Sequence, residues 1–159
     1  MEENKVAVGD FVKDFSLIGD DDKEYKISDY INNKNVLVFF YSKDNTSGCT
    51  LEVTEFGELS EEISKYDFII FGISKDIVKT HCNFKKKLNL NFTLLSDTER
   101  IVMKQFDVVV NKKMYGKDVI GTERSTFIIN KQGKLVKEFR KVKPANHAQE
   151  VLGYIKQNF

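Results

Sequence analysis

Two short segments of almost uninterrupted apolar residues constrain the fold of this chain more than any other feature. They are NVLVFFY, residues 35–41, and DFIIFGIS, residues 67–74. A strand with one solvated face alternates apolar and polar residues, whereas a strand covered on both faces reads as a continuous apolar run. We therefore predict two central, parallel strands in a sheet that is covered on both faces.

The segment between these strands has the periodicity of an amphipathic helix. Apolar side chains recur there at steps of three, three and four residues, at Val53, Phe56, Leu59 and Ile63. This spacing places them on one face of a helix that we expect to run from about residue 50 to residue 65. The first half of the chain thus predicts a strand-helix-strand unit.

The rhythm of alternating helices and strands continues along the chain. A second helix is predicted from about residue 76 to residue 88, with an apolar stripe made of Ile77, His81, Phe84 and Leu88. The extended segment NFTLLSD follows at residues 91–97, and a third helix is expected near residues 99–106.

Both ends of the chain add antiparallel and helical elements. Residues 14–30 read as an entry hairpin around an acidic turn, and residues 124–139 as a second hairpin in which Gly133 supplies the permissive turn conformation. Residues 146–159 form an amphipathic pattern. We predict an α/β fold with a mixed central sheet flanked by helices on both faces, and we take residues 1–159 as a single domain.

Charge and hydropathy argue against several classes of function. The formal net charge is only +1, and the longest basic run, residues 85–87, fits a solvated helix face better than a nucleic-acid contact. The sequence has no run approaching the roughly 18 apolar residues of a membrane span. Its first residues are acidic and resemble no secretory signal. We expect a cytoplasmic protein that binds neither nucleic acid nor membrane.

The chain has two cysteines, Cys49 and Cys82. Cys49 follows a Thr-Ser-Gly turn at the start of the first predicted helix, where free backbone N–H groups and the helix dipole stabilise a thiolate, the nucleophilic form. The alternative is a small buried apolar residue, which is common for free cysteine. We find no Cys-x-x-Cys, His/Cys metal spacing, Gly-x-Ser-x-Gly or P-loop motif, which leaves thiol redox or cysteine acyl chemistry and predicts no metal or cofactor.

Two further residues are candidates for stabilising charge next to Cys49. Thr46 offers a hydroxyl three residues earlier in the same turn. Arg124 opens the segment RSTFII, and strand ends in an α/β sheet face the crevice where ligands bind. The alternative for Arg124 is a surface ion pair with a neighbour such as Glu123.

Several of these segments together resemble the peroxiredoxin family, and within it the bacterioferritin comigratory protein or PrxQ branch. They are YSKDNTSGCTLEVTEF, GISKD, FTLLSD and ERSTFIINKQGKL, in this order. The resemblance covers nearly the whole chain. It implies a thioredoxin-like fold and the reduction of hydrogen peroxide and organic hydroperoxides, with no metal or prosthetic group.

The motif match implies a role for each candidate. Cys49 corresponds to the peroxidatic cysteine, Thr46 to the motif threonine and Arg124 to the active-site arginine, while Glu52 falls where this branch usually has a glutamate. The family's motif proline, which covers the thiolate and limits access of water, is Ser42 in this chain. We expect this departure to affect the pKa of the Cys49 thiol and its efficiency with peroxide.

The resemblance also implies how oxidised Cys49 is recycled. Some members carry a resolving cysteine five residues after the first, where this chain has Thr54, so Cys82 is the candidate within the chain. We expect an intramolecular disulfide, thioredoxin as the reductant and a monomer, with the two cysteines apart in the reduced fold. The alternatives are an external thiol that resolves Cys49 directly, a peroxide-sensing relay to a client protein, and a non-redox binding domain on the same fold.

Overall fold

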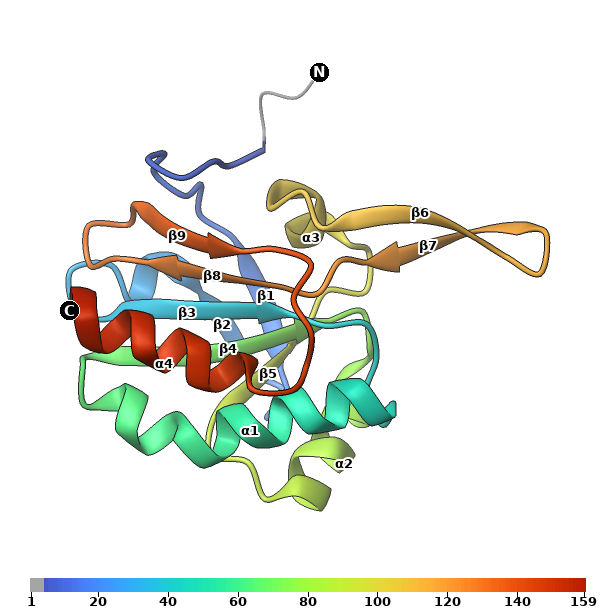
Figure 1. Cartoon of the computed structure of the whole chain (residues 1–159), viewed down its shortest axis with the longest axis horizontal. Coiled ribbons are helices and arrows are strands. Elements are labelled where there is room, and N and C mark those ends of the chain that lie inside the picture. The colour runs from blue at the N-terminus through green and yellow to red at the C-terminus, as the bar shows by residue number, and fades with distance from the viewer. Residues whose placement is uncertain (1–4) are drawn as a thin grey trace.

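The structure is a computed structural model that describes residues 5–159. Its main sheet has seven strands in the order β2-β1-β5-β4-β3-β8-β9. The strands are β1 (Ser16–Gly19), β2 (Glu24–Lys26), β3 (Asn35–Phe40), β4 (Phe68–Ser74), β5 (Thr93–Ser96), β8 (Ser125–Ile129) and β9 (Leu135–Phe139). Figure 1 shows β3 between β8 and β4.

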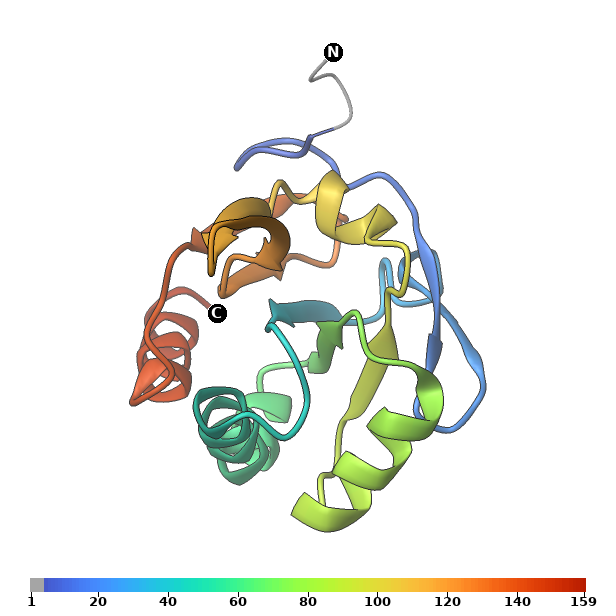
Figure 2. The same ribbon diagram turned by 90° about the vertical axis from the view of Figure 1, so that its right-hand side faces the viewer.

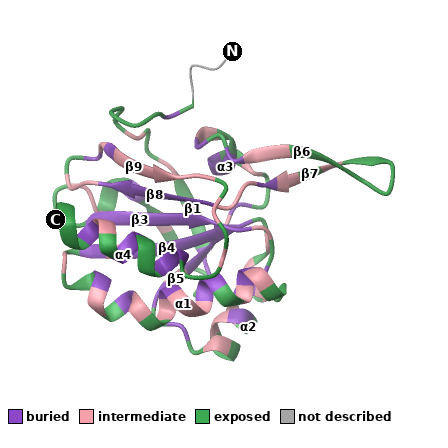
Figure 3. Cartoon of the chain, viewed as in Figure 1, coloured by how far each residue is buried: buried purple, intermediate pink, exposed green. Residues whose placement is uncertain are grey.

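The two apolar segments form the centre of the sheet, as predicted. β3 pairs in parallel with β4, which pairs in parallel with β5, whereas β8 runs antiparallel to β3 on its other side. All six residues of β3 are buried, and the buried strands stand out in the centre of Figure 3. The predicted mixed sheet is therefore confirmed.

Helices cover both faces of the sheet. Figure 2 shows α4 (His147–Asn158), α1 (Ser47–Ser64) and α2 (Val78–Leu88) following one another around one face. The short helix α3 (Ile101–Gln105) lies on the opposite face, together with the 3-10 helix η1 (Ile27–Asp29). This arrangement agrees with the α/β class predicted from the sequence.

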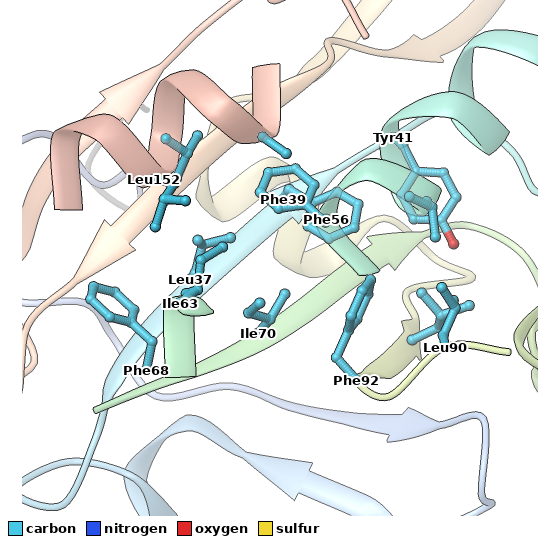
Figure 4. Close-up of a cluster of buried hydrophobic side chains, with 14 of the residues drawn as sticks. Leu37, Phe39, Tyr41, Phe56, Ile63, Phe68, Ile70, Leu90, Phe92 and Leu152 are labelled. Atoms are coloured by element: carbon cyan, nitrogen blue, oxygen red, sulfur yellow. The ribbon is translucent and has the colours of Figure 1, made fainter. Parts of the chain in front are cut away.

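Alternation along β3 divides its aromatic side chains between two cores. Phe39 stacks on Phe56 of α1 with 4.5 Å between ring centroids, in the cluster that Figure 4 shows beneath α4. Phe40 points the other way and meets Phe106 and Phe127 on the α3 side. Burial of each such ring stabilises the fold by about 1.5–3 kcal/mol relative to its exposure, so both cores hold β3 in place.

Two helices begin at other residues than predicted. The backbone N–H of Thr50 donates to the carbonyl of Thr46 at 2.8 Å, so α1 starts at Ser47 rather than near residue 50. α2 starts at Val78, and Ile77 is the extended residue that precedes it. The prediction that Ile77 belongs to the apolar stripe of this helix is wrong, because Ile77 is 58% exposed. In the preceding turn the Ser74 hydroxyl donates to the Asp76 carboxylate and accepts from the Asp76 backbone N–H, so these two residues bond to each other and not within the helix.

A second, two-stranded sheet was not predicted. It is a hairpin of β6 (Val109–Met114) and β7 (Lys117–Thr122), and it projects from the main body in Figure 1. Its turn consists of Tyr115 and Gly116, both with positive φ. Two consecutive positive φ angles are typical of two-residue hairpin turns, so the Tyr-Gly pair was the signal in the sequence.

Within residues 5–159, no helix is both long enough and apolar enough to span a lipid bilayer.

Candidate active site

Cys49 is the third residue of α1, just beyond the loop that follows β3. Its side chain is a free thiol and only 1% of the residue is exposed. It lies at the edge of the apolar cluster that includes Phe39 and Tyr41. A thiol in this place is shielded from bulk water, and only a small molecule reaches it without a movement of the chain.

The start of α1 leaves backbone donors around this thiol. Thr46 precedes the helix with an extended backbone, yet its side chain makes no capping hydrogen bond. The Thr46 hydroxyl instead donates to the carbonyl of Lys43 at 3.0 Å. The first N–H groups of a helix have no partner within the helix, so those of Gly48 and Cys49 form a natural site for an anion or a polarised oxygen.

Arg124 reaches Cys49 because of the register between two strands. Ser125, the first residue of β8, pairs with Phe40 at the end of β3, and this places Arg124 beside the loop that leads to Cys49. Its Nη1 donates to Oε1 of Glu52 at 2.9 Å, and Glu52 and Cys49 both act to raise the pKa of the guanidinium. Glu123 pairs with Arg140 at 3.0 Å instead, so the surface ion pair considered for Arg124 is not the one that forms.

Gly48 provides the space in which the guanidinium lies. A Cβ atom on Gly48 would stand 3.3 Å from Nη2 of Arg124 and 3.4 Å from Cγ of Pro144. The first distance is closer than most side chains tolerate, so any larger residue at this position displaces the arginine. This role was not predicted from the sequence, although Gly48 directly precedes the cysteine.

Glu52 lies one helical turn after Cys49, and its side chain is fully buried. Burial raises the pKa of Glu52 to about 7, although the charge and hydrogen bond of Arg124 act in the opposite direction. Its Oε2 atom has no hydrogen-bond partner among the described residues. The spacing of three residues from Cys49 was the signal that both side chains share a helix face.

The two partners of this ion pair respond differently to their burial. Desolvation of the Arg124 guanidinium is outweighed by its attraction to Glu52 and Cys49, and the pKa of Arg124 rises. Arg124 keeps 19% of its side chain exposed, whereas Glu52 keeps none. Burial of the pair therefore mainly shifts the pKa of Glu52, which titrates near neutral pH.

The remaining candidates lie away from this group. Cys82 is a free, half-buried thiol in α2, a helix that packs against β5 and β1, whereas α1 packs against α4 and β4. His147 is the first residue of α4. His81, predicted on the apolar stripe of α2, is completely buried, and both of its ring nitrogens have hydrogen-bond partners.

A hollow of about 790 Å³ lies elsewhere on the molecule, between α3 and the segment that leads into β1. Its lining includes Phe15, Ser96 and Lys104 but none of the residues around Cys49. This hollow is therefore separate from the thiol site.

Comparison with known proteins gives consistent matches over most of the chain. The sequence model of the AhpC/TSA family matches residues 8–138. Peroxiredoxin Bcp of Bacillus subtilis is 42% identical over 151 residues, which cover 95% of this chain and 96% of that protein. Peroxiredoxin Bcp of Escherichia coli K12 is 35% identical over 155 residues, which cover 98% and 99%.

Solved structures agree with the sequence comparison. A PrxQ mutant of Xylella fastidiosa superposes with a TM-score of 0.90 at 36% identity, covering 96% of each chain. The bacterioferritin comigratory protein of Xanthomonas campestris superposes with a TM-score of 0.85 at 38% identity, covering 90% of each chain. The fold described above is therefore the thioredoxin-like fold of these proteins.

Proposed function

The chain belongs to the AhpC/TSA family as a peroxiredoxin of the Bcp/PrxQ type, a thiol peroxidase, and from this premise we propose that Cys49 is its peroxidatic cysteine. One observation carries the proposal: a shielded thiol in the first turn of α1 lies beside the guanidinium of Arg124. A helix start and a neighbouring cation both favour the thiolate, which is the reactive form of cysteine.

The chemistry is an attack of the Cys49 thiolate on one oxygen of the peroxide. A sulfur–oxygen bond forms while the oxygen–oxygen bond breaks, and Cys49 becomes a sulfenic acid. The leaving oxygen departs as hydroxide or alkoxide and takes up a proton to give water or an alcohol. Sulfur is oxidised, the peroxide is reduced, and the step requires no metal or prosthetic group.

Charge on the leaving oxygen is stabilised by donors that are already in place. We assign this role to the Arg124 guanidinium and to the backbone N–H of Cys49. Thr46 contributes its hydroxyl once it exchanges its bond to the Lys43 carbonyl for one to the substrate. Loss of one such prepositioned donor typically slows an enzyme by about 100-fold to 1,000-fold.

The proposed substrates are hydrogen peroxide and organic hydroperoxides. The near-complete burial of Cys49 favours small peroxides, because a large one needs the surrounding loop to move. The Xanthomonas campestris relative is described as having alkyl peroxide reduction activity, which supports an organic substrate for this chain.

Recycling is proposed to run through Cys82. The Cys82 thiol attacks the sulfenic acid of Cys49, a disulfide forms and water leaves. Thioredoxin then reduces the disulfide by thiol exchange.

The same family resemblance leads us to propose a monomer of one domain, residues 1–159, that works in the cytoplasm. Gel filtration tests the oligomeric state, and cell fractionation tests the location.

The test is peroxide consumption by the purified protein with thioredoxin, its reductase and NADPH. The intact chain should turn over, Cys49→Ser should consume nothing, and Cys82→Ser should complete one turnover and then stop as sulfinic acid accumulates. Sustained turnover by Cys49→Ser would refute the assignment of Cys49. Sustained turnover by Cys82→Ser would show instead that an external thiol resolves Cys49.

A further inference from the structure

A buried polar network connects the loop before Cys49 with the helix that carries Cys82. The Tyr41 hydroxyl donates to Oδ1 of Asp44 at 2.6 Å, and Oδ2 of Asp44 lies 2.7 Å from Nδ1 of His81. The Asp44 backbone N–H and the Ser74 hydroxyl both donate to Oδ2 of Asp76, at 2.8 and 2.6 Å. We call these five residues the Asp44–His81 network.

The centre of this network is the buried contact between His81 and Asp44. Nδ1 of His81 faces the Asp44 carboxylate, and Nε2 faces the carbonyl oxygen of Leu95 at 3.0 Å. The hydroxyls of Tyr41 and Ser74 lie 3.5 Å from Nδ1 and Nε2, so polar groups surround the whole ring. Neither side chain of the pair is exposed. Separating the two side chains leaves buried polar atoms without hydrogen-bond partners, so the contact resists opening.

The network does not have the character of a cation site. The ligand atoms of Asp44, Asp76 and His81 lie within 4.8 Å of one another. However, the oxygens of Asp44 already face Tyr41 and His81, and Oδ2 of Asp76 already accepts two hydrogen bonds. The group therefore acts as a mechanical connection between two segments of the chain.

Its position relates it to both thiols. Asp44 lies five residues before Cys49, in the loop between β3 and α1, and His81 directly precedes Cys82 in α2. Tyr41 places its ring in the apolar core and its hydroxyl at the edge of that core, as Figure 4 shows. A second contact joins the same segments, since Lys87 of α2 donates to the side chain of Asn45 at 3.3 Å.

A disulfide requires the two Cα atoms to come within about 7 Å. The two cysteines lie in separate helices that pack on different strands, so the backbone of at least one helix has to move. If the first turn of α2 unwinds to release Cys82, His81 is withdrawn from Asp44, because His81 and Cys82 are neighbours in the chain. If the loop before α1 moves instead, Asp44 leaves His81. Either route separates the same pair.

We propose that the Asp44–His81 network is a latch: closed, it positions the loop of Cys49 for peroxide, and it has to open before Cys49 and Cys82 form their disulfide. His81 is then a positioning residue that acts on Cys49 through Asp44. The inference rests on the proposed roles of both cysteines. The step that it controls joins the Cys82 thiol to the Cys49 sulfenic acid, forms one S–S bond and releases one water.

The test compares the intact chain with His81→Asn, which keeps a donor near the position of Nδ1 but loses the contact of Nε2 with Leu95. After a peroxide pulse, the disulfide step is the phase whose rate does not depend on peroxide concentration. We expect this phase to become several-fold faster in His81→Asn, while the peroxide-dependent phase becomes slower. Lys79→Gln, on an exposed position of the same helix, is the matched control and should change neither phase.

Hydrogen exchange gives a readout that does not depend on peroxide chemistry. In a chain that also carries Cys49→Ser, His81→Asn should speed amide exchange in residues 42–46 and 78–84, and Lys79→Gln should not. This hydrogen-exchange experiment tests the latch even if Cys49 proves unreactive. An unreactive Cys49 would refute the proposed function but not the latch.

Tyr41→Phe keeps the ring in the core and removes the hydroxyl that contacts Asp44 and His81, so it covers the case in which His81→Asn does not fold. It should speed exchange in the same two segments by a smaller factor. Exchange and disulfide rates that match the intact chain in the folded variants would overturn the proposal.

Discussion

Replacing Glu52 by glutamine should make the protein more stable at alkaline pH while leaving its stability near pH 4 almost unchanged. Glu52 is fully buried beside Arg124, and burial raises the pKa of its carboxyl to about 7 from an ordinary value of 4.5. A carboxyl whose pKa is higher in the folded than in the unfolded chain favours folding in its protonated form. That stabilisation is complete below about pH 4.5 and is lost as pH rises through about 7.

The size of the effect follows from the two pKa values. Each tenfold difference in proton affinity between the folded and unfolded states is worth about 1.4 kcal/mol. The difference between 4.5 and about 7 therefore corresponds to about 3 kcal/mol between pH 4 and pH 8. Glutamine keeps the shape of the neutral acid and does not titrate, so Glu52→Gln should avoid this loss.

The assay is denaturant unfolding of both proteins at pH 4, 6 and 8, with the slope of the transition checked for two-state behaviour. We expect the free energy of unfolding of Glu52→Gln to exceed that of the intact chain by about 3 kcal/mol at pH 8 and to match it at pH 4. Glu58→Gln changes an exposed carboxyl on the same helix and serves as the control. Parallel pH profiles for Glu52→Gln and the intact chain would refute the reasoning, because Glu52 would then titrate normally.

Three further substitutions test the donors around Cys49. Arg124→Lys keeps the charge but loses the planar guanidinium with its several fixed donors, so the rate constant with hydrogen peroxide in stopped flow should fall about 100-fold or more; a change below threefold would exclude a role in the step. Thr46→Val removes the hydroxyl and should slow the same reaction about tenfold or more, since one donor to the leaving oxygen is lost; equal rates would show that the hydroxyl only supports the loop. Gly48→Ala should lower activity without lowering stability. The new Cβ displaces Arg124, whereas alanine stabilises a helix by up to about 1 kcal/mol relative to glycine. We expect a several-fold slower reaction with an unchanged or higher free energy of unfolding, and the opposite pattern would contradict the geometry at this glycine.

Strong local patterns predicted most of the architecture. The apolar runs of β3 and β4 indicated central parallel strands, because only strands covered on both faces lack polar alternation. Gly133 indicated the turn between β8 and β9, and the structure shows its φ at +85°. The hairpin of β6 and β7 was missed because its residues are largely exposed, so no apolar periodicity marks it.

The candidate site was predictable only in part. The sequence placed Cys49 at a helix start, and the family motif singled out Arg124 and Thr46. The pairing of Arg124 with Glu52 depends on the register between β8 and β3, which no local pattern encodes. The burial of His81 against Asp44 likewise joins residues 37 positions apart. Contacts of this kind follow from tertiary packing and required the structure.

The most direct test of the central claim is to identify the side chain that peroxide oxidises first. The Cys82→Ser protein is treated with one equivalent of hydrogen peroxide in the presence of a reagent that traps sulfenic acids, and the modified residue is mapped by mass spectrometry. We predict an adduct on Cys49, formed at the rate at which peroxide disappears, and no adduct in the matching Cys49→Ser protein. Peroxide consumption without modification of Cys49, or equal consumption by Cys49→Ser, would contradict the account.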